Sequence, residues 1–303
     1  MNLESLTAGA RALDKYSIAR LISLFENNHE ESLSRRRQVL EQLKDRPVAP
    51  IVGFTGTPGA GKSTLIGRLA ALVYTEQKKS LAILAIDPSS QTSGGSLLGD
   101  RTRVRLPSVK ELFFRSQATD GQMGGLGRST FQVCRLLERL FDLIFIETVG
   151  IGQNEIEIQH VADRVYLTLA PLGGDTVQFI KAGIMEIPDA IILNKADQPA
   201  AEKSFHELKA SLPLARSGRT IPLFKASAAS GQGLEEILSD LSMQLVVRAD
   251  KAAYFLERWI YDEYGRAGLR FLQKLQPLPA ATFEEKQLAF ARLYETGFRG
   301  HVT

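Results

Sequence analysis

Short apolar runs alternate with amphipathic stretches through most of the chain, from Ile51 to about Leu245. This alternation is typical of βαβ units, in which helices cover both faces of a mostly parallel sheet. Residues 143–146, Leu-Ile-Phe-Ile, are apolar at every position and suit a central strand that is covered on both sides. The pattern predicts an α/β fold with strands at residues 51–55, 81–86, 112–114, 143–147, 164–169, 190–194 and 223–226.

The N-terminal residues carry a helical pattern instead. Apolar side chains such as Ile18, Leu21 and Phe25 recur at helical spacing, which predicts helices over most of the first 45 residues. Pro47 and Pro50 then end the arm, because proline lacks an amide donor and biases the preceding residue away from the helix.

The C-terminal residues are predicted to form an amphipathic helix over 250–275 and a further helix over 283–294. An apolar stripe outside an already complete sheet domain serves either packing within the chain or a dimer interface. We expect a helical arm at 1–47, an α/β domain at 48–247 and a helical extension at 248–303 that is used for dimerisation.

Charge and cysteine content exclude several classes of protein. The net charge of the 303 residues is only +3 and the charged residues are interspersed, so no basic stripe indicates a nucleic-acid partner. Cys134 is the single cysteine, which excludes an internal disulfide and favours a reducing compartment. No run of 18 apolar residues occurs, so we expect no membrane partner and a cytoplasmic location, or an organelle matrix in a eukaryote.

A phosphate-binding motif directly follows the first predicted strand and opens a helix. It has the form G-x-x-x-x-G-K-[ST], in which glycines turn backbone amides toward a phosphate at the helix N-terminus. Lys62 is expected to reach the β- and γ-phosphate oxygens, and Ser63 to supply a hydroxyl to Mg²⁺. The predicted nucleotide-binding residues here are Gly56, Thr57, Pro58, Gly59, Ala60, Gly61, Lys62, Ser63 and Thr64.

Carboxylates at the ends of neighbouring strands are the second requirement of this chemistry, because they hold the metal ion or its waters. Asp87 ends the second predicted strand, and Glu147 ends the run at 143–147. Gly150 follows shortly after Glu147, where a glycine can sense the γ-phosphate. Asp100 lies in a polar, glycine-rich stretch and is a third candidate; the alternative is that it pairs with a neighbouring arginine.

A base-recognition motif of the form N-K-x-D closes a later strand, with Asn194, Lys195 and Asp197. An aspartate there accepts two hydrogen bonds from the guanine N1–H and exocyclic amine, which adenine cannot offer, so the site favours GTP over ATP. Lys195 would cover the face of the base. Ser227 and Ala228 follow the last strand, where a backbone amide can reach the guanine O6.

Taken together, these motifs resemble the MeaB/ArgK family of P-loop GTPases, which includes the methylmalonic aciduria type A protein. The likeness covers about residues 15–265. It rests on residues 56–64, 87–90, 99–103, 115–116, 124–126, 147–153, 174–181 and 194–197.

The resemblance implies a homodimer that uses GTP, GDP and Mg²⁺ to chaperone a cobalamin-dependent acyl-CoA mutase, by gating cofactor loading and protecting the mutase. Adenosylcobalamin would sit on the partner, and a cobalamin adenosyltransferase is a second candidate partner. The family's Mg²⁺ ligands carry over to Ser63, Asp87, Asp100 and Glu147. Its nucleotide-responsive segment carries over to 175–181, where Lys181 would reach the nucleotide.

Hydrolysis is expected to proceed by in-line attack of water on the γ-phosphate, with charge neutralised by Mg²⁺, Lys62 and the loop amides. The candidate catalytic residues are Lys62, Glu147, Gly150, Gln153 and Lys181. Gln153 lies three residues after Gly150, and its alternative is an ordinary polar switch residue. Incomplete machinery predicts slow intrinsic turnover that a partner accelerates.

Three other functions are compatible with the phosphate loop. A metal-insertion GTPase of the hydrogenase or urease accessory type needs soft or imidazole ligands, and one cysteine with four scattered histidines gives no such tract. A noncatalytic GTP-regulated scaffold differs mainly in whether turnover matters. A small-molecule kinase fits poorly with the N-K-x-D motif and the lack of a recognisable acceptor site.

Overall fold

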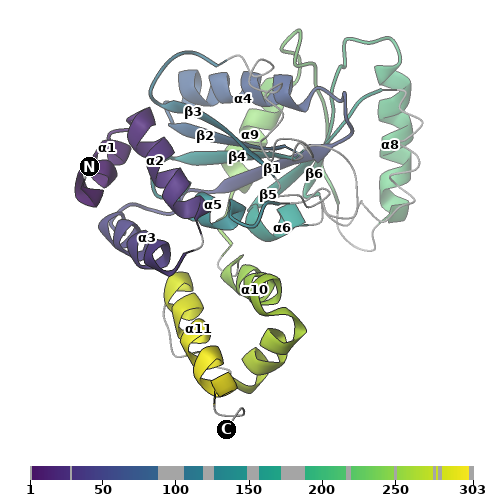
Figure 1. Ribbon diagram of the computed structural model, residues 1–303. Helices are drawn as coiled ribbons and strands as arrows, with labels where there is room; N and C mark the ends of the chain where they lie inside the picture. Colours follow the sequence, from purple (N-terminus) through teal and green to yellow (C-terminus); the bar gives the residue numbers. More distant parts are fainter. Residues whose placement is uncertain are drawn as a thin grey trace, which may run out of the picture. The chain divides into compact units, whose positions relative to one another are not determined.

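The computed structural model divides the chain into two compact units, a sheet unit of residues 48–130 and 141–247 and a helical unit of residues 1–47, 131–140 and 248–303 (Figure 1). Each unit is considered by itself. The residues that the structure describes are 2–27, 29–87, 106–118, 126–148, 157–171, 188–215, 220–248, 251–275, 278 and 282–299.

The sheet unit is built on seven strands, all of whose pairings are parallel, in the order β3-β2-β4-β1-β5-β6-β7. All seven predicted strands are confirmed. The largest difference is in β3, which continues past the apolar run through Arg115, Ser116 and Gln117 because it pairs with β2 along its whole length. The strands are β1 Ile51–Gly56, β2 Leu81–Asp87, β3 Leu112–Ala118, β4 Leu143–Thr148, β5 Arg164–Leu169, β6 Ala190–Leu193 and β7 Leu223–Lys225.

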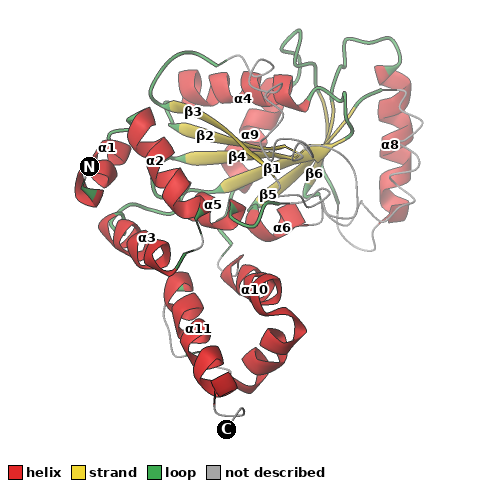
Figure 2. Cartoon of the chain, viewed as in Figure 1, coloured by secondary structure: helices red, strands yellow, loops and turns green. Residues whose placement is uncertain are grey.

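Helices cover both faces of this sheet, as predicted (Figure 2). On one face, α4 (Lys62–Gln77) and α9 (Leu234–Gln244) share a core with alternate strand residues that include Phe54 and Tyr166. On the other face, α8 (Ala201–Ala215) packs through Leu208.

A short helix, α6 (Ile158–Val161), also lies on the second face. A Cβ atom at Gly53 would lie 2.6 Å from the Ile158 side chain, so glycine at this position in β1 allows α6 to approach the strand closely.

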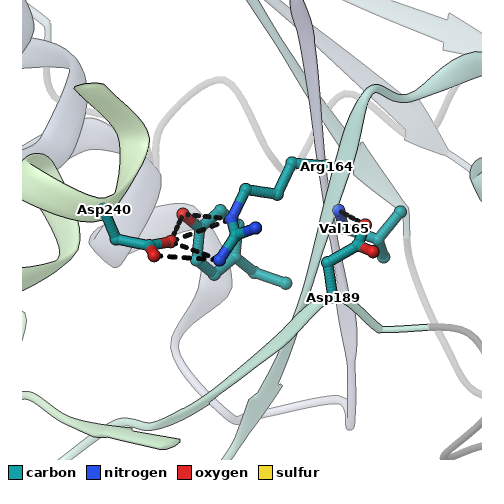
Figure 3. Close-up of polar contacts among 5 residues, drawn as sticks. Arg164, Val165, Asp189 and Asp240 are labelled. Atoms are coloured by element: carbon teal, nitrogen blue, oxygen red, sulfur yellow. Dashed lines mark hydrogen bonds and ion pairs between the residues drawn. The ribbon is translucent and has the colours of Figure 1, made fainter. Parts of the chain in front are cut away.

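Three aspartates tie the amino-terminal edge of the sheet together. Each aspartate directly precedes a strand. Its carboxylate accepts a backbone N–H either from a residue of the neighbouring strand or from the residue just before that neighbouring strand. Asp142 accepts from Ser80 at 2.8 Å, Asp163 from Ile51 at 2.7 Å and Asp189 from Val165 at 3.0 Å, the last of which Figure 3 shows. Buried amides at the edge are thereby satisfied.

A buried ion pair joins α9 to β5 on the face of α4 (Figure 3). Arg164 donates from Nε and Nη2 to the two carboxylate oxygens of Asp240 at 2.8 and 2.9 Å. The Tyr166 hydroxyl also donates to Asp240, and the Arg164 guanidinium lies 5.4 Å from the centroid of the Tyr166 ring.

In the helical unit, the N-terminal residues form α1 (Leu3–Arg11), α2 (Lys15–Glu26) and α3 (Glu30–Gln42), in agreement with the predicted helical arm. Arg36 on α3 is fully buried and donates to the carbonyl oxygens of Leu24 and Asn27, which close the last turn of α2. Burial lowers the pKa of this guanidinium to about 10.

The rest of the helical unit consists of α5 (Thr130–Leu137, in the unit from Phe131 onward), α10 (Lys251–Leu275) and α11 (Phe283–Arg299). Gly265 interrupts α10 with φ of 62°, so the predicted helix over 250–275 is two helical pieces joined at a kink. None of the described helices is long and apolar enough to cross a membrane. Dimerisation through residues 248–303 stays a prediction.

Candidate functional site

The phosphate loop leaves the carboxyl end of β1 and enters α4 at Lys62. Its three glycines, Gly56, Gly59 and Gly61, all have positive φ, which other residues rarely adopt, and two of them also leave no room for a Cβ atom. Gly56 has φ of 138°, and a Cβ atom there would lie 1.9 Å from the carbonyl oxygen of Thr168. Gly61 has φ of 83°, and its Cβ would lie 2.6 Å from the Asn194 amide nitrogen. The loop path therefore depends on glycine at both positions.

Lys62 is held within this loop. Its side chain is only 6% exposed, and Nζ donates to the carbonyl oxygens of Gly56 at 2.7 Å and Thr57 at 3.1 Å. The first amides of α4 have no partner inside the helix, so a cation and several N–H groups converge at the N-terminus of a long helix. That combination suits the β- and γ-phosphates of a nucleotide.

A hydroxyl and a carboxylate meet beside the loop. Ser63 Oγ donates to Glu147 Oε1 at 2.7 Å, and Glu147 is 3% exposed at the end of β4. The parallel register of β1 and β4 pairs Phe54 with Glu147, which brings the β4 carboxyl end to the loop. Asp87 is the last residue of β2, at the same edge of the sheet, because Ile86 pairs with Thr148.

The other predicted residues of the phosphate and metal site fall outside what the structure describes. They are Asp100, Gly150, Gln153 and Lys181, together with the side chain of Asp87. Their roles stay predictions, as do those of the residues that the structure brings together.

On the base side, Asn194 links two loops. Its side-chain nitrogen donates to the carbonyl oxygen of Ala60 at 2.8 Å and more weakly to that of Gly61 at 3.3 Å. Its side-chain oxygen accepts the backbone N–H of Ala228 at 3.1 Å. Asn194 is 1% exposed, so this amide is a structural clamp between the phosphate loop and the loop after β7.

Asp197 is oriented by Ser227, whose hydroxyl donates to Asp197 Oδ1 at 2.5 Å. This hydrogen bond is the main reason that the pKa of Asp197 is lowered, so the carboxylate stays ionised and can accept from a base. Between the two acceptor residues, Lys195 adopts a left-handed conformation with φ of 58°, which is uncommon for a side chain of this size.

Comparisons with known proteins identify the family. The family model described as "Methylmalonyl Co-A mutase-associated GTPase MeaB" matches residues 18–253. The chain belongs to this family.

Two relatives show how far the similarity extends. A protein of Pyrococcus abyssi that is named as a GTPase is 40% identical over 233 residues, which are 74% of this chain and 70% of that protein. The mouse protein "Methylmalonic aciduria type A homolog, mitochondrial" is 34% identical over 270 residues, 82% of this chain and 64% of that protein.

Solved structures show the fold alone. A structure titled "LAO/AO transport system kinase" matches with a TM-score of 0.65 and 21% identity, and covers 98% of both chains. The hydrogenase maturation factor HypB from Archaeoglobus fulgidus matches with a TM-score of 0.52 and 19% identity, over 72% of this chain and 98% of that one.

As a MeaB-family P-loop GTPase, the chain hydrolyses GTP and uses Mg²⁺. The chemistry of the site fits the ion, because the Ser63 hydroxyl and the Glu147 carboxylate are hard oxygen donors held next to each other. An ion between them would also compensate the buried charge of Glu147.

Gln117 was not singled out in the sequence. It is 4% exposed near the end of β3, donates from Nε2 to Ser129 Oγ at 2.9 Å and accepts from Thr130 Oγ1 at 2.8 Å. Hydrophobic periodicity alone ends this strand at residue 114. The one feature of the sequence that could have pointed to Gln117 is that it is a polar residue just beyond the apolar run. In this MeaB-family chain, Gln117 fixes the first residue of α5 to the nucleotide edge of the sheet.

Proposed function

We propose that this chain is a GTP-dependent chaperone of a cobalamin-dependent acyl-CoA mutase, which gates loading of the cofactor and protects the mutase from inactivation. The match to a family whose description includes association with methylmalonyl-CoA mutase carries the proposal. The name of the mouse relative supports the same class of partner. A homodimer is the proposed working form, with adenosylcobalamin on the partner and a cobalamin adenosyltransferase as a further partner.

In the proposed mechanism, the protein holds the nucleotide at two points, the phosphates and the guanine edge. The loop amides and Lys62 bind the β- and γ-phosphates, Asp197 accepts from the guanine edge, and Asn194 keeps the two regions in register. Ser63 and Glu147 would hold Mg²⁺, with Asp87 and Asp100 as the further proposed ligands. The ion supplies positive charge that offsets the negative charge developing on the phosphate oxygens.

Slow turnover that the mutase accelerates is part of the proposal. Lys62 is the residue proposed to neutralise charge, but among the described residues no side chain is assigned to position the attacking water. A partner that orders the remaining groups would raise the rate, as in other switch GTPases. Gln153 and Lys181 are the proposed residues for that step.

The test is GTP hydrolysis with and without a purified cobalamin-dependent acyl-CoA mutase from the same source. Strong stimulation that requires GTP rather than ATP, and that is lost in Lys62→Ala, supports the chaperone function and identifies the mutase. If GTP is bound and hydrolysed but no mutase changes the rate, the partner assignment fails while the GTPase assignment stands.

A matched variant excludes stimulation by a contaminating GTPase. Asp197→Asn replaces an acceptor by a donor at the base, so it should reject GTP and accept xanthosine triphosphate, whose C2 oxygen takes a hydrogen bond. Stimulation by the mutase should then follow xanthosine triphosphate. Stimulation that stays with GTP in this variant does not come from this chain.

The scaffold alternative makes a different prediction for Lys62→Ala. If nucleotide binding alone drives the function, a variant that binds GTP without hydrolysing it should still protect the mutase from inactivation during turnover. Calorimetry must first show that Lys62→Ala still binds GTP, because Lys62 contacts the phosphates in the proposal. With binding retained, loss of protection together with loss of hydrolysis favours the catalytic reading.

A further inference from the structure

Helix α5 connects two strands of the sheet along the chain, but it packs with the helical unit. It lies in the chain between β3 and β4, which are both strands of the sheet. Residues 131–140 nevertheless cluster with the N- and C-terminal helices and not with the sheet unit. The chain therefore enters and leaves the helical unit within a single βαβ connection.

Aromatic contacts attach α5 to the C-terminal helices. The ring of Phe131 stacks on Phe255 of α10, with centroids 4.3 Å apart and an interplanar angle of 8°. It also meets Phe283 of α11 edge-on at 5.1 Å. Phe131 is 5% exposed and Phe283 is 3% exposed, so these rings form the centre of the contact.

A partly buried ion pair reinforces this attachment. Arg135 of α5 pairs with Glu284 of α11, whose side chain is 1% exposed, and the guanidinium lies 5.4 Å from the Phe283 ring centroid. Farther along the chain, Arg139 donates to the carbonyl oxygen of Arg46 at 2.5 Å, beyond the end of α3. Residues 131–140 thus contact the C-terminal part of the helical unit through α5 itself and the N-terminal part through Arg139, just after the helix.

Some buried polar atoms at this attachment lack a hydrogen-bond partner. Oε2 of Glu284 and both side-chain amide atoms of Gln287 are buried and have no hydrogen-bond partner among the described residues. Gln287 is fully buried on the same face of α11. Buried polar groups without a partner are uncommon in folded proteins and lower stability, so this attachment is not an optimally packed core.

The chain segments before and after α5 connect it to the edge of the sheet that carries the proposed nucleotide site. Gln117 fixes Ser129 and Thr130, where α5 begins. Gln117 pairs in register with Ile86, the residue before Asp87. After α5 the chain runs directly into β4, which ends at Glu147 and Thr148. Both strands that flank α5 therefore end at or beside predicted magnesium ligands.

We propose that α5 is the element through which the nucleotide state of the sheet unit changes the packing of the helical unit, with Phe131 and the Arg135–Glu284 pair as its attachment. The proposal rests on the nucleotide site and not on the identity of a partner. Coupling of this kind is reciprocal. Weakening the attachment must therefore change the preference of the protein for GTP over GDP.

Trp259 provides the readout. It is the single tryptophan of the chain, lies on α10, and contacts the rings of Tyr264 and Phe290 at centroid distances of 5.6 and 6.2 Å within the helical unit. Its fluorescence should differ between the full-length protein saturated with GDP and with a non-hydrolysable GTP analogue. Calorimetry on the same samples measures binding of each nucleotide, so failure to bind is separated from failure to couple.

Arg135→Met should abolish the fluorescence difference and change the ratio of the GTP-analogue and GDP dissociation constants by about 5-fold or more. Arg37→Met is the matched control, because Arg37 of α3 pairs with Glu285 of α11 at 3.4 Å without involving α5. The control variant should keep the wild-type fluorescence difference and the wild-type ratio of the GTP-analogue and GDP dissociation constants.

Two further variants guard against a fold defect, which circular dichroism would reveal. Arg135→Met combined with Glu284→Met removes both charges of the pair, and Phe131→Leu keeps an apolar side chain but loses the ring contacts. Either variant should still bind nucleotide but should lose the difference in Trp259 fluorescence between the two nucleotide states. Equal Trp259 spectra in the two nucleotide states of the wild type, or a wild-type difference retained in folded attachment variants, would overturn the proposal.

Discussion

The side-chain amide of Asn194 donates to the carbonyl oxygen of Ala60 at 2.8 Å, so a residue of the base-recognition motif also holds the phosphate loop. Removing the amide leaves two backbone groups, the Ala60 carbonyl and the Ala228 N–H, without this partner. Each lost hydrogen bond is worth about 1 kcal/mol. Asn194→Ala should weaken GTP and GDP binding alike by roughly 10- to 30-fold.

Calorimetric titration of both nucleotides checks this expectation. Lys203→Ala is a suitable control, because Lys203 is exposed and pairs with Glu207 at 3.9 Å on α8. A loss confined to one nucleotide would show that Asn194 contacts the phosphates differently in the two states and does not act as a clamp.

Glu147 and Ser63 form the proposed magnesium pair, which predicts a metal-dependent defect. Glu147→Gln preserves size and can still accept from Ser63, but it removes the charge that attracts the ion. Hydrolysis should fall by about 10²-fold or more, and more Mg²⁺ should be needed for half-maximal rate. GDP affinity without metal should change little.

Rates measured over a Mg²⁺ titration test the role of Glu147, with Glu202→Gln on the surface as the control. Glu202 pairs with Lys225 at the start of α8, away from the phosphate loop. A variant with a normal Mg²⁺ dependence and a reduced rate would assign Glu147 to a step other than metal binding.

Ser227→Ala should change the pH dependence of nucleotide binding. The Ser227 hydroxyl lowers the pKa of Asp197, and guanine needs the ionised carboxylate as its acceptor. Without the hydroxyl, the Asp197 pKa rises, so protonation begins at a higher pH. The acid limb of a plot of GDP affinity against pH should therefore shift upward, while affinity near pH 8 is less affected. An unmoved acid limb would show that another group controls it.

Much of this structure could be predicted from local patterns. The seven strands and the phosphate loop follow from apolar runs and glycine spacing, because parallel strands covered on both faces must be apolar throughout. These features depend on short-range sequence, which periodicity captures.

Other features depend on partners that are distant in sequence. Gln117 belongs to β3 because the whole of β3 pairs with β2. The last residues of β3 are mostly polar, so the apolar pattern does not predict that the strand continues to Gln117. The kink at Gly265 breaks a segment whose amphipathic period continues across it. Periodicity also cannot show that α5, although it connects two strands of the sheet, packs with terminal helices.

The Arg164–Asp240 pair provides a test of what holds α9 to the sheet. Asp240→Ala leaves the Arg164 guanidinium and the Tyr166 hydroxyl without their shared acceptor, so the free energy of unfolding should fall by about 3–5 kcal/mol. Tyr166 stays a donor at any ordinary pH, because burial raises its pKa and the hydrogen bond to Asp240 adds to that rise. Denaturant unfolding followed by circular dichroism gives the difference.

Removing the whole polar set should be far less costly than removing one member. Arg164→Met, Asp240→Leu and Tyr166→Phe together leave no buried group without a partner and keep the side-chain volumes similar. The triple variant should lie much closer to wild type in unfolding free energy than Asp240→Ala does. If the triple variant loses as much as the single variant, the directed hydrogen bonds, rather than compensation of buried charge, fix α9 on β5.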